Sequence, residues 1–84
     1  MNNLNKAAKA GQLDLVKLLL DRGANAHVYD NSALCWASKR GHTKVVKLLL
    51  DHGADVHARD DEALRWASNT EVVKLLKKHC EKSN

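Results

Sequence analysis

Histidines are the side chains of this 84-residue chain best suited to binding a metal ion. His27 and His57 stand at equivalent positions 30 residues apart, and His52 with Asp55 or His57 offers a short ligand spacing. Zinc and other transition metals need several such ligands in one shell. No two histidines are four positions apart, and no carboxylate triad completes a set. We therefore predict that the protein binds neither a metal nor a cofactor.

Ser38, Ser68 and Cys35 are the candidate nucleophiles, with the histidines as candidate bases. Nucleophilic catalysis requires a nucleophile, a base and an orienting group held together in a pocket. The chain contains no G-x-S-x-G, no glycine loop that would bind a phosphate and no H-E-x-x-H. We predict that the protein is not an enzyme and has no catalytic residues.

The composition indicates a small helical domain. The chain is 44% hydrophobic, has no proline and has only four glycines, which favours helices over a loop-rich fold. Cys35 and Cys80 are too few for a disulfide-dense secreted scaffold. No apolar run reaches the roughly 18 residues of a membrane span, and residues 1–6 lack the apolar segment of a signal peptide. We expect an intracellular, cytoplasmic protein without a membrane partner.

The chain repeats itself with a period of 30 residues. The matching segments are 15–21 with 45–51, 23–27 with 53–57, and 33–38 with 63–68. Beyond Ser68 the shift falls to 27, because 45–49 (VVKLL) returns as 72–76 (VVKLL). We predict one domain of three units, at about 2–26, 27–56 and a shortened 57–80, followed by a tail at 81–84.

Each unit is predicted to form two short helices. In the middle unit, one of residues 30–32 caps the first helix, and Gly41 ends it because glycine adopts the left-handed conformation without steric cost. The second helix, from Lys44 to about Asp51, is apolar around most of its circumference. Its own partner helix is too short to cover it, so neighbouring units must do so, as in a solenoid.

The last unit has two possible conformations. With Asn69 in place of the glycine and Thr70 as N-cap, it forms a broken helix pair. Alternatively, one continuous helix places Leu64, Ser68 and Val72 on a single face. We favour the broken pair.

The segment from Gly41 to His57, G-H-x-x-V-V-K-L-L-L-D-x-G-A-D-x-H, resembles the ankyrin repeat family. The resemblance implies an all-α solenoid of stacked antiparallel helix pairs. The usual repeat has about 33 residues and opens with T-P-L-H, whereas this period is 30 and the middle unit has Ser32–Cys35 (SALC) there. We therefore expect the connecting loops to be shortened. This short form is similar to arrays common in giant DNA viruses, which would place a viral protein in the host cytoplasm.

Trp36 and Trp66 stand at equivalent positions, one period apart. As exposed rings they would offer a stacking platform for nucleic-acid bases. Their flanking alanines and serines favour close helix packing instead, so we predict that both indoles fill the gap between units. Truncation of Trp36 would then cost about 3 kcal/mol.

The resemblance implies that loop tips and the exposed side of the first helices line a concave groove for a partner protein. The candidate binding residues are Tyr29, Asp30, Asn31, Arg59, Asp60, Asp61 and Glu62 in the loops, and Lys9, Lys39, Arg40 and Arg65 on the helices. Their mixed charges suit a protein with complementary charges. The alternatives are a basic nucleic-acid-binding module, to which the mild net charge of +4 gives little support, and a self-associating piece of a longer array. We expect a monomer or weak self-association.

Overall fold

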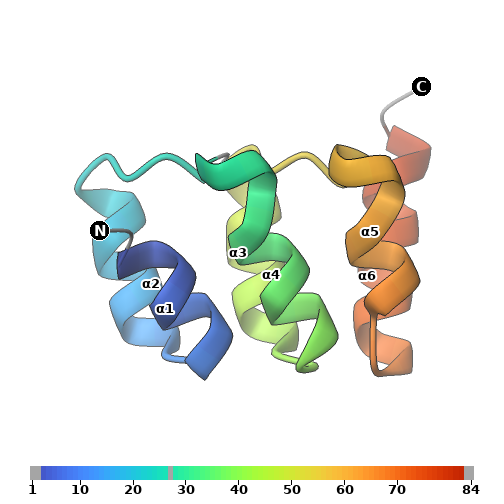
Figure 1. Ribbon diagram of the computed structural model, residues 1–84, viewed down its shortest axis with the longest axis horizontal. Helices are drawn as coiled ribbons and strands as arrows, with labels where there is room; N and C mark the ends of the chain where they lie inside the picture. The colour runs from blue at the N-terminus through green and yellow to red at the C-terminus, as the bar shows by residue number, and fades with distance from the viewer. Residues whose placement is uncertain (1–2, 27, 83–84) are drawn as a thin grey trace.

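The computed structural model describes residues 3–26 and 28–82, and the side chains of these residues except 3, 28–31, 58–61 and 80–82. The helices are α1 (Asn3–Ala10), α2 (Leu13–Asp21), α3 (Val28–Lys39), α4 (Thr43–Asp51), α5 (Ala58–Trp66) and α6 (Thr70–Lys82). They stand as three antiparallel pairs in a row, and the described residues contain no strand (Figure 1). The predicted all-α solenoid is confirmed.

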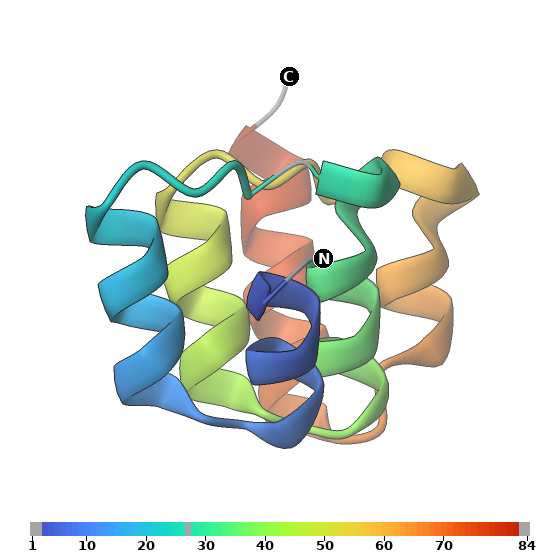
Figure 2. The ribbon, with the colours of Figure 1, turned by 60° about the vertical axis from the view of Figure 1, so that its left-hand side comes forward.

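The pairs form two layers, which Figure 2 shows from one side of the row. The first helices pack in the order α1, α3, α5, and the second helices in the order α2, α4, α6. Each first helix also packs on the second helix of its own pair. Contacts therefore run between neighbouring pairs along the row, which is the arrangement that stabilises a solenoid.

Neighbouring pairs bury the apolar helices, as the amphipathic pattern predicts. Val46 and Leu49 of α4 are completely buried, and α4 packs between α2 and α6. Val45 is 2% exposed, whereas Leu15 at the equivalent position of α2 is 38% exposed. The difference arises because, within the described residues, α2 has a second-helix neighbour only on the α4 side, so burial here depends on position in the row.

Glycine turns join the two layers. Gly41 has a φ of 74°, and the N–H groups of Gly41 and His42 donate to the carbonyls of Ser38 and Ala37. This is the Schellman pattern, which satisfies the last carbonyls of α3. A Cβ on Gly41 would also lie 2.8 Å from Asn69 Nδ2. Glycine is needed here for its backbone conformation and for the space it leaves to the next unit.

The first helices begin earlier than predicted. α3 starts at Val28 and α5 at Ala58, so residues 29–31 and 59–62 form helical turns and not loop tips. Figure 1 shows the opening turns of α3 and α5 bent away from the rest of each helix. Before α5, Asp55 Oδ1 accepts a hydrogen bond from the His57 N–H at 2.9 Å. With three residues fewer than the usual repeat, the chain passes from this short turn directly into helix.

The last unit is a broken pair, as predicted, because α5 ends at Trp66 and α6 begins at Thr70. The cap differs from the prediction. Asn69 Oδ1 accepts a hydrogen bond from the Val72 N–H at 2.8 Å, so Asn69 is the N-cap and Thr70 is the first helical residue. Asn69 Nδ2 donates to the Gly41 carbonyl at 3.2 Å. The asparagine thus caps α6 and ties it to the preceding unit.

Candidate partner-binding face

The exposed side of the α1–α3–α5 layer carries cations at the C-terminal ends of its helices. Lys9, Lys39 and Arg65 stand in the last turns of α1, α3 and α5. Cations are favoured there because the terminal carbonyls give a helix end partial negative charge. We define the first-helix face as the surface formed by Lys6, Lys9, Trp36, Lys39, Arg40, Arg65 and Trp66.

Lysines and tryptophans alternate along this face. Lys9 Nζ lies 4.3 Å from the centre of the Trp36 ring. Lys39 Nζ lies 5.1 Å from that ring and 4.8 Å from the Trp66 ring. Lys9 comes from α1, which packs beside α3, whereas Lys39 and Trp36 are both on α3. We call the series Lys9–Trp36–Lys39–Trp66 the lysine–tryptophan ladder.

The ladder holds its cations by attraction to the indole faces. A cation within about 6 Å of a tryptophan ring gains about 0.5–1 kcal/mol at an exposed site. Arg40 adds a third cation, with Cζ 5.8 Å from the centre of the Trp36 ring. Lys9, Lys39 and Arg40 are nevertheless exposed. They are therefore positioned by the protein and still accessible to a ligand.

The prediction that both indoles fill the gap between units is wrong. Trp66 is 42% exposed and Trp36 is half-buried. The space inside the layer is occupied by Ala33, Leu34, Ala37 and Ala63, which are all buried. Helices that approach one another through alanines leave no room for an indole, so the rings lie at the outer surface. One signal pointed there: Lys39 follows Trp36 by three positions, which places both on one side of a helix.

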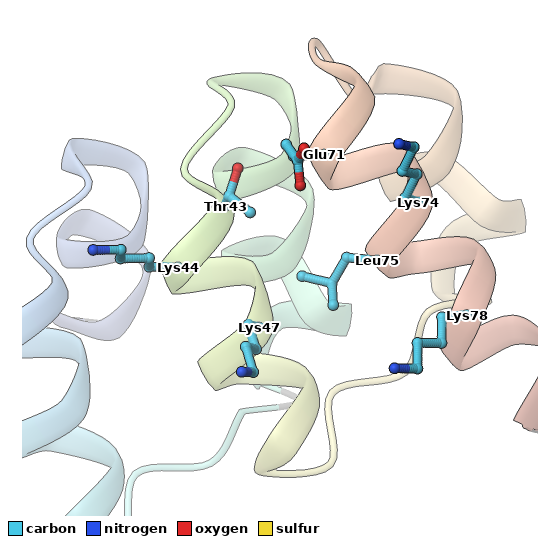
Figure 3. A pocket seen from close by; sticks show the side chains of 7 residues that line it. All are labelled: Thr43, Lys44, Lys47, Glu71, Lys74, Leu75 and Lys78. Atoms are coloured by element: carbon cyan, nitrogen blue, oxygen red, sulfur yellow. The ribbon is translucent and has the colours of Figure 1, made fainter.

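Several hollows lie on the opposite layer and at the turns. Between α4 and α6, one of about 370 Å³ is lined by Thr43, Lys44, Lys47, Glu71, Lys74, Leu75 and Lys78. Figure 3 shows Leu75 pointing from α6 toward α4 among these lysines. A second, of about 460 Å³, lies between α2 and α4 and includes Lys17, Lys47, Asp14 and Asp51. These hollows are shallow grooves with both charges present.

A family model described as ankyrin repeats (3 copies) matches residues 4–84. The chain belongs to the ankyrin repeat family. Ankyrin repeats are generally protein–protein interaction modules, and the family is generally a non-enzymatic binding scaffold. None of the curated proteins matches the chain. Among the described residues, no helix of this ankyrin array is long and apolar enough to cross a membrane.

The ankyrin array brings some of the predicted binding residues together. Lys9, Lys39, Arg40 and Arg65 are exposed on the first-helix face. Glu62 is half-buried, with its Oε2 4.0 Å from the Cys35 thiol. The side chains of Tyr29, Asp30, Asn31, Arg59, Asp60 and Asp61 lie outside the described residues, although their backbones form the opening turns of α3 and α5.

His42 links two units of the array, a role that sequence reasoning did not assign to it. Its Nε2–H donates to the Lys9 carbonyl at 3.1 Å, and a Cβ on Gly11 would lie 2.6 Å from its ring. Of the two histidines at equivalent positions, His57 is exposed and His27 lies outside the described residues. No group of three His, Cys, Asp or Glu side chains in the described part of the chain could hold a metal ion.

Proposed function

We propose that this ankyrin array binds a partner protein through the first-helix face and the opening turns of α3 and α5, without chemistry of its own. The lysine–tryptophan ladder is the observation that carries the proposal. Trp and Arg side chains dominate the energetics of protein interfaces, and both types are present here at the surface. Side chains already held in place lose less conformational entropy on binding, which favours Lys9 and Lys39 as contact residues.

The ladder gives less support to a nucleic-acid-binding module. Base stacking requires an accessible ring face, but the ammonium groups of Lys9 and Lys39 both lie close to the Trp36 ring. Trp66 offers the more open ring. Binding to nucleic acid would then depend mainly on phosphate contacts and would weaken steeply with added salt.

We also propose that the protein acts inside the cell. The sequence has two cysteines, too few for a disulfide-dense secreted scaffold, and the fold depends on apolar packing between units. Reducing compartments suit such a domain, since disulfides persist only in oxidising ones.

A pull-down from cell lysate tests the proposed face. The K39E/R40E variant reverses two cations of the first-helix face, and the K17E/K47E variant reverses two exposed cations of α2 and α4. We expect K39E/R40E to lose specific protein bands that the wild type and K17E/K47E retain. Circular dichroism confirms that both variants are folded.

Unchanged capture by folded K39E/R40E would overturn the proposed face. Loss of capture after nuclease treatment would instead favour the nucleic-acid module, as would a steep dependence on salt.

A further inference from the structure

The first-helix face is strongly cationic over its described side chains. It carries Lys6, Lys9, Lys39, Arg40 and Arg65, and the carboxylate described in the same layer is Glu62, half-buried beside Cys35. Asp30 stands nine residues before Lys39, in the opening turn at the other end of α3. The C-terminal ends of α1 and α3 therefore present positive charge with little local compensation.

From this charge and geometry we infer that the lysine–tryptophan ladder binds an acidic segment of the partner protein. The segment carries two carboxylates that pair with Lys9 and Lys39 and an apolar side chain that packs on Trp66. This inference rests on the proposed function, because it names the kind of partner that the same face would take.

The spacing of the two lysines suits carboxylates on a single peptide. Both ammonium groups lie near the Trp36 ring, so they are separated by no more than 9.4 Å, the sum of their 4.3 and 5.1 Å distances from its centre. Alternate side chains of an extended strand are about 6.6 Å apart and point to the same side. Two acidic residues at positions i and i+2 can therefore each reach one lysine.

The ladder also places an apolar contact next to these charges. Lys39 Nζ lies 4.8 Å from the centre of the Trp66 ring, and Trp66 is 42% exposed. Continuing the extended segment by two residues brings a third side chain to this indole. The motif that fits is acidic-x-acidic-x-apolar, read along the stack from α1 to α5.

A labelled peptide tests the motif directly. The probe is fluorescein-Gly-Ser-Glu-Ser-Glu-Ser-Leu-Ser-Gly-amide, together with its reversed sequence, since a strand can lie in either direction. Matched controls replace both glutamates by glutamine or the leucine by serine. Fluorescence anisotropy measures binding, and because Trp36 and Trp66 are the two tryptophans of the chain, their emission reports whether the peptide reaches the ladder.

We expect one probe direction to bind and to change the tryptophan emission. The glutamine control should bind at least fivefold more weakly, as expected for the loss of two exposed ion pairs. The affinity of the K9Q/K39Q variant for the glutamate peptide should fall by a similar factor. The K17Q/K47Q variant removes two exposed lysines of the other layer, and its affinity should stay within twofold of the wild type.

Three results would overturn the inference. They are equal affinity for the glutamate and glutamine peptides, an equal loss of affinity in the two lysine variants, and no binding of the probe in either direction. Stronger binding of a twelve-residue oligothymidylate would overturn it as well. If the peptides fail while lysate capture still depends on Lys39 and Arg40, the partner class is wrong and the proposed function stands. If both fail, the first-helix face is not the binding site.

Discussion

The two layers of this ankyrin array both display lysines, but the neighbours of those lysines differ. On the second-helix layer, Lys17 and Lys47 share a groove with Asp14 and Asp51. On the first-helix face, Lys9 and Lys39 lie against indole rings. A nearby carboxylate cancels much of the charge that a lysine presents, whereas an indole orients the ammonium and leaves its charge in place. Two surfaces with the same residue type thus surround their lysines with different chemical groups.

The difference also explains why we place the candidate binding face outside the grooves. The larger hollows lie between second helices, where lysines and fewer carboxylates surround partly buried leucines. The candidate binding face is a row of side chains on an exposed layer. In this array, we take the sign and order of the surface charges as a better guide to the candidate binding face than the shape of the surface.

Truncating a buried side chain of the core should have the largest effect on the free energy of unfolding. Leu49 is completely buried, so Leu49→Ala should lower the free energy of unfolding by about 3 kcal/mol. Leu18 is 47% exposed in α2, and Leu18→Ala should cost about 1 kcal/mol or less. Urea denaturation followed by circular dichroism measures both. Similar losses for the two variants would contradict the difference in burial between Leu49 and Leu18.

Truncating the indoles should have an intermediate effect on the free energy of unfolding, and the effect should be larger at Trp36 than at Trp66. Trp36 is half-buried and attracts three cations, so Trp36→Ala should cost about 2 kcal/mol, below the loss typical of a fully buried tryptophan. Trp66→Ala should cost about 1 kcal/mol, since this ring is more exposed. The same denaturation measurement applies. A larger loss at Trp66 would mean that the outer indole belongs to the core after all.

Neutralising single lysines should have the smallest effect on stability. It also compares the two layers most directly, because the same substitution is made in each. Lys39→Gln removes contacts with two indoles and should cost about 1 kcal/mol. Lys47→Gln should change stability by less than about 0.5 kcal/mol, as is usual for an exposed substitution. Thermal melts at physiological salt report both values. Equal shifts in melting temperature would show that the indoles do not stabilise Lys39.

Local chemistry made several parts of the structure predictable. Gly41 has the positive φ that its place after an apolar helix required. The broken turn before α6 followed from Asn69, although the residue acts as the N-cap and not as a replacement for glycine. The helix starts at Val28 and Ala58 were missed, because the sequence pattern placed a shortened loop where the chain forms a helical turn.

The candidate site was only partly predictable. Lys9, Lys39 and Arg40 were identified as exposed cations, but their contact with the indoles was not, since both tryptophans were assigned to the core. A periodic aromatic residue between alanines is compatible with either side of a helix layer. Whether the ring lies inside the layer or on its outer surface depends on how closely the neighbouring helices approach one another.

By itself, the sequence determined the repeat, the helix pairs and the all-α solenoid. The reason is that the spacing of the apolar residues, the glycine turns and the helix caps can each be read from residues within one unit. Only the tertiary structure decided the ladder and its open face. Lys9, Trp36 and Trp66 come from three successive units, and the close packing of alanine-lined helices sets whether their side chains meet inside the stack or on its surface.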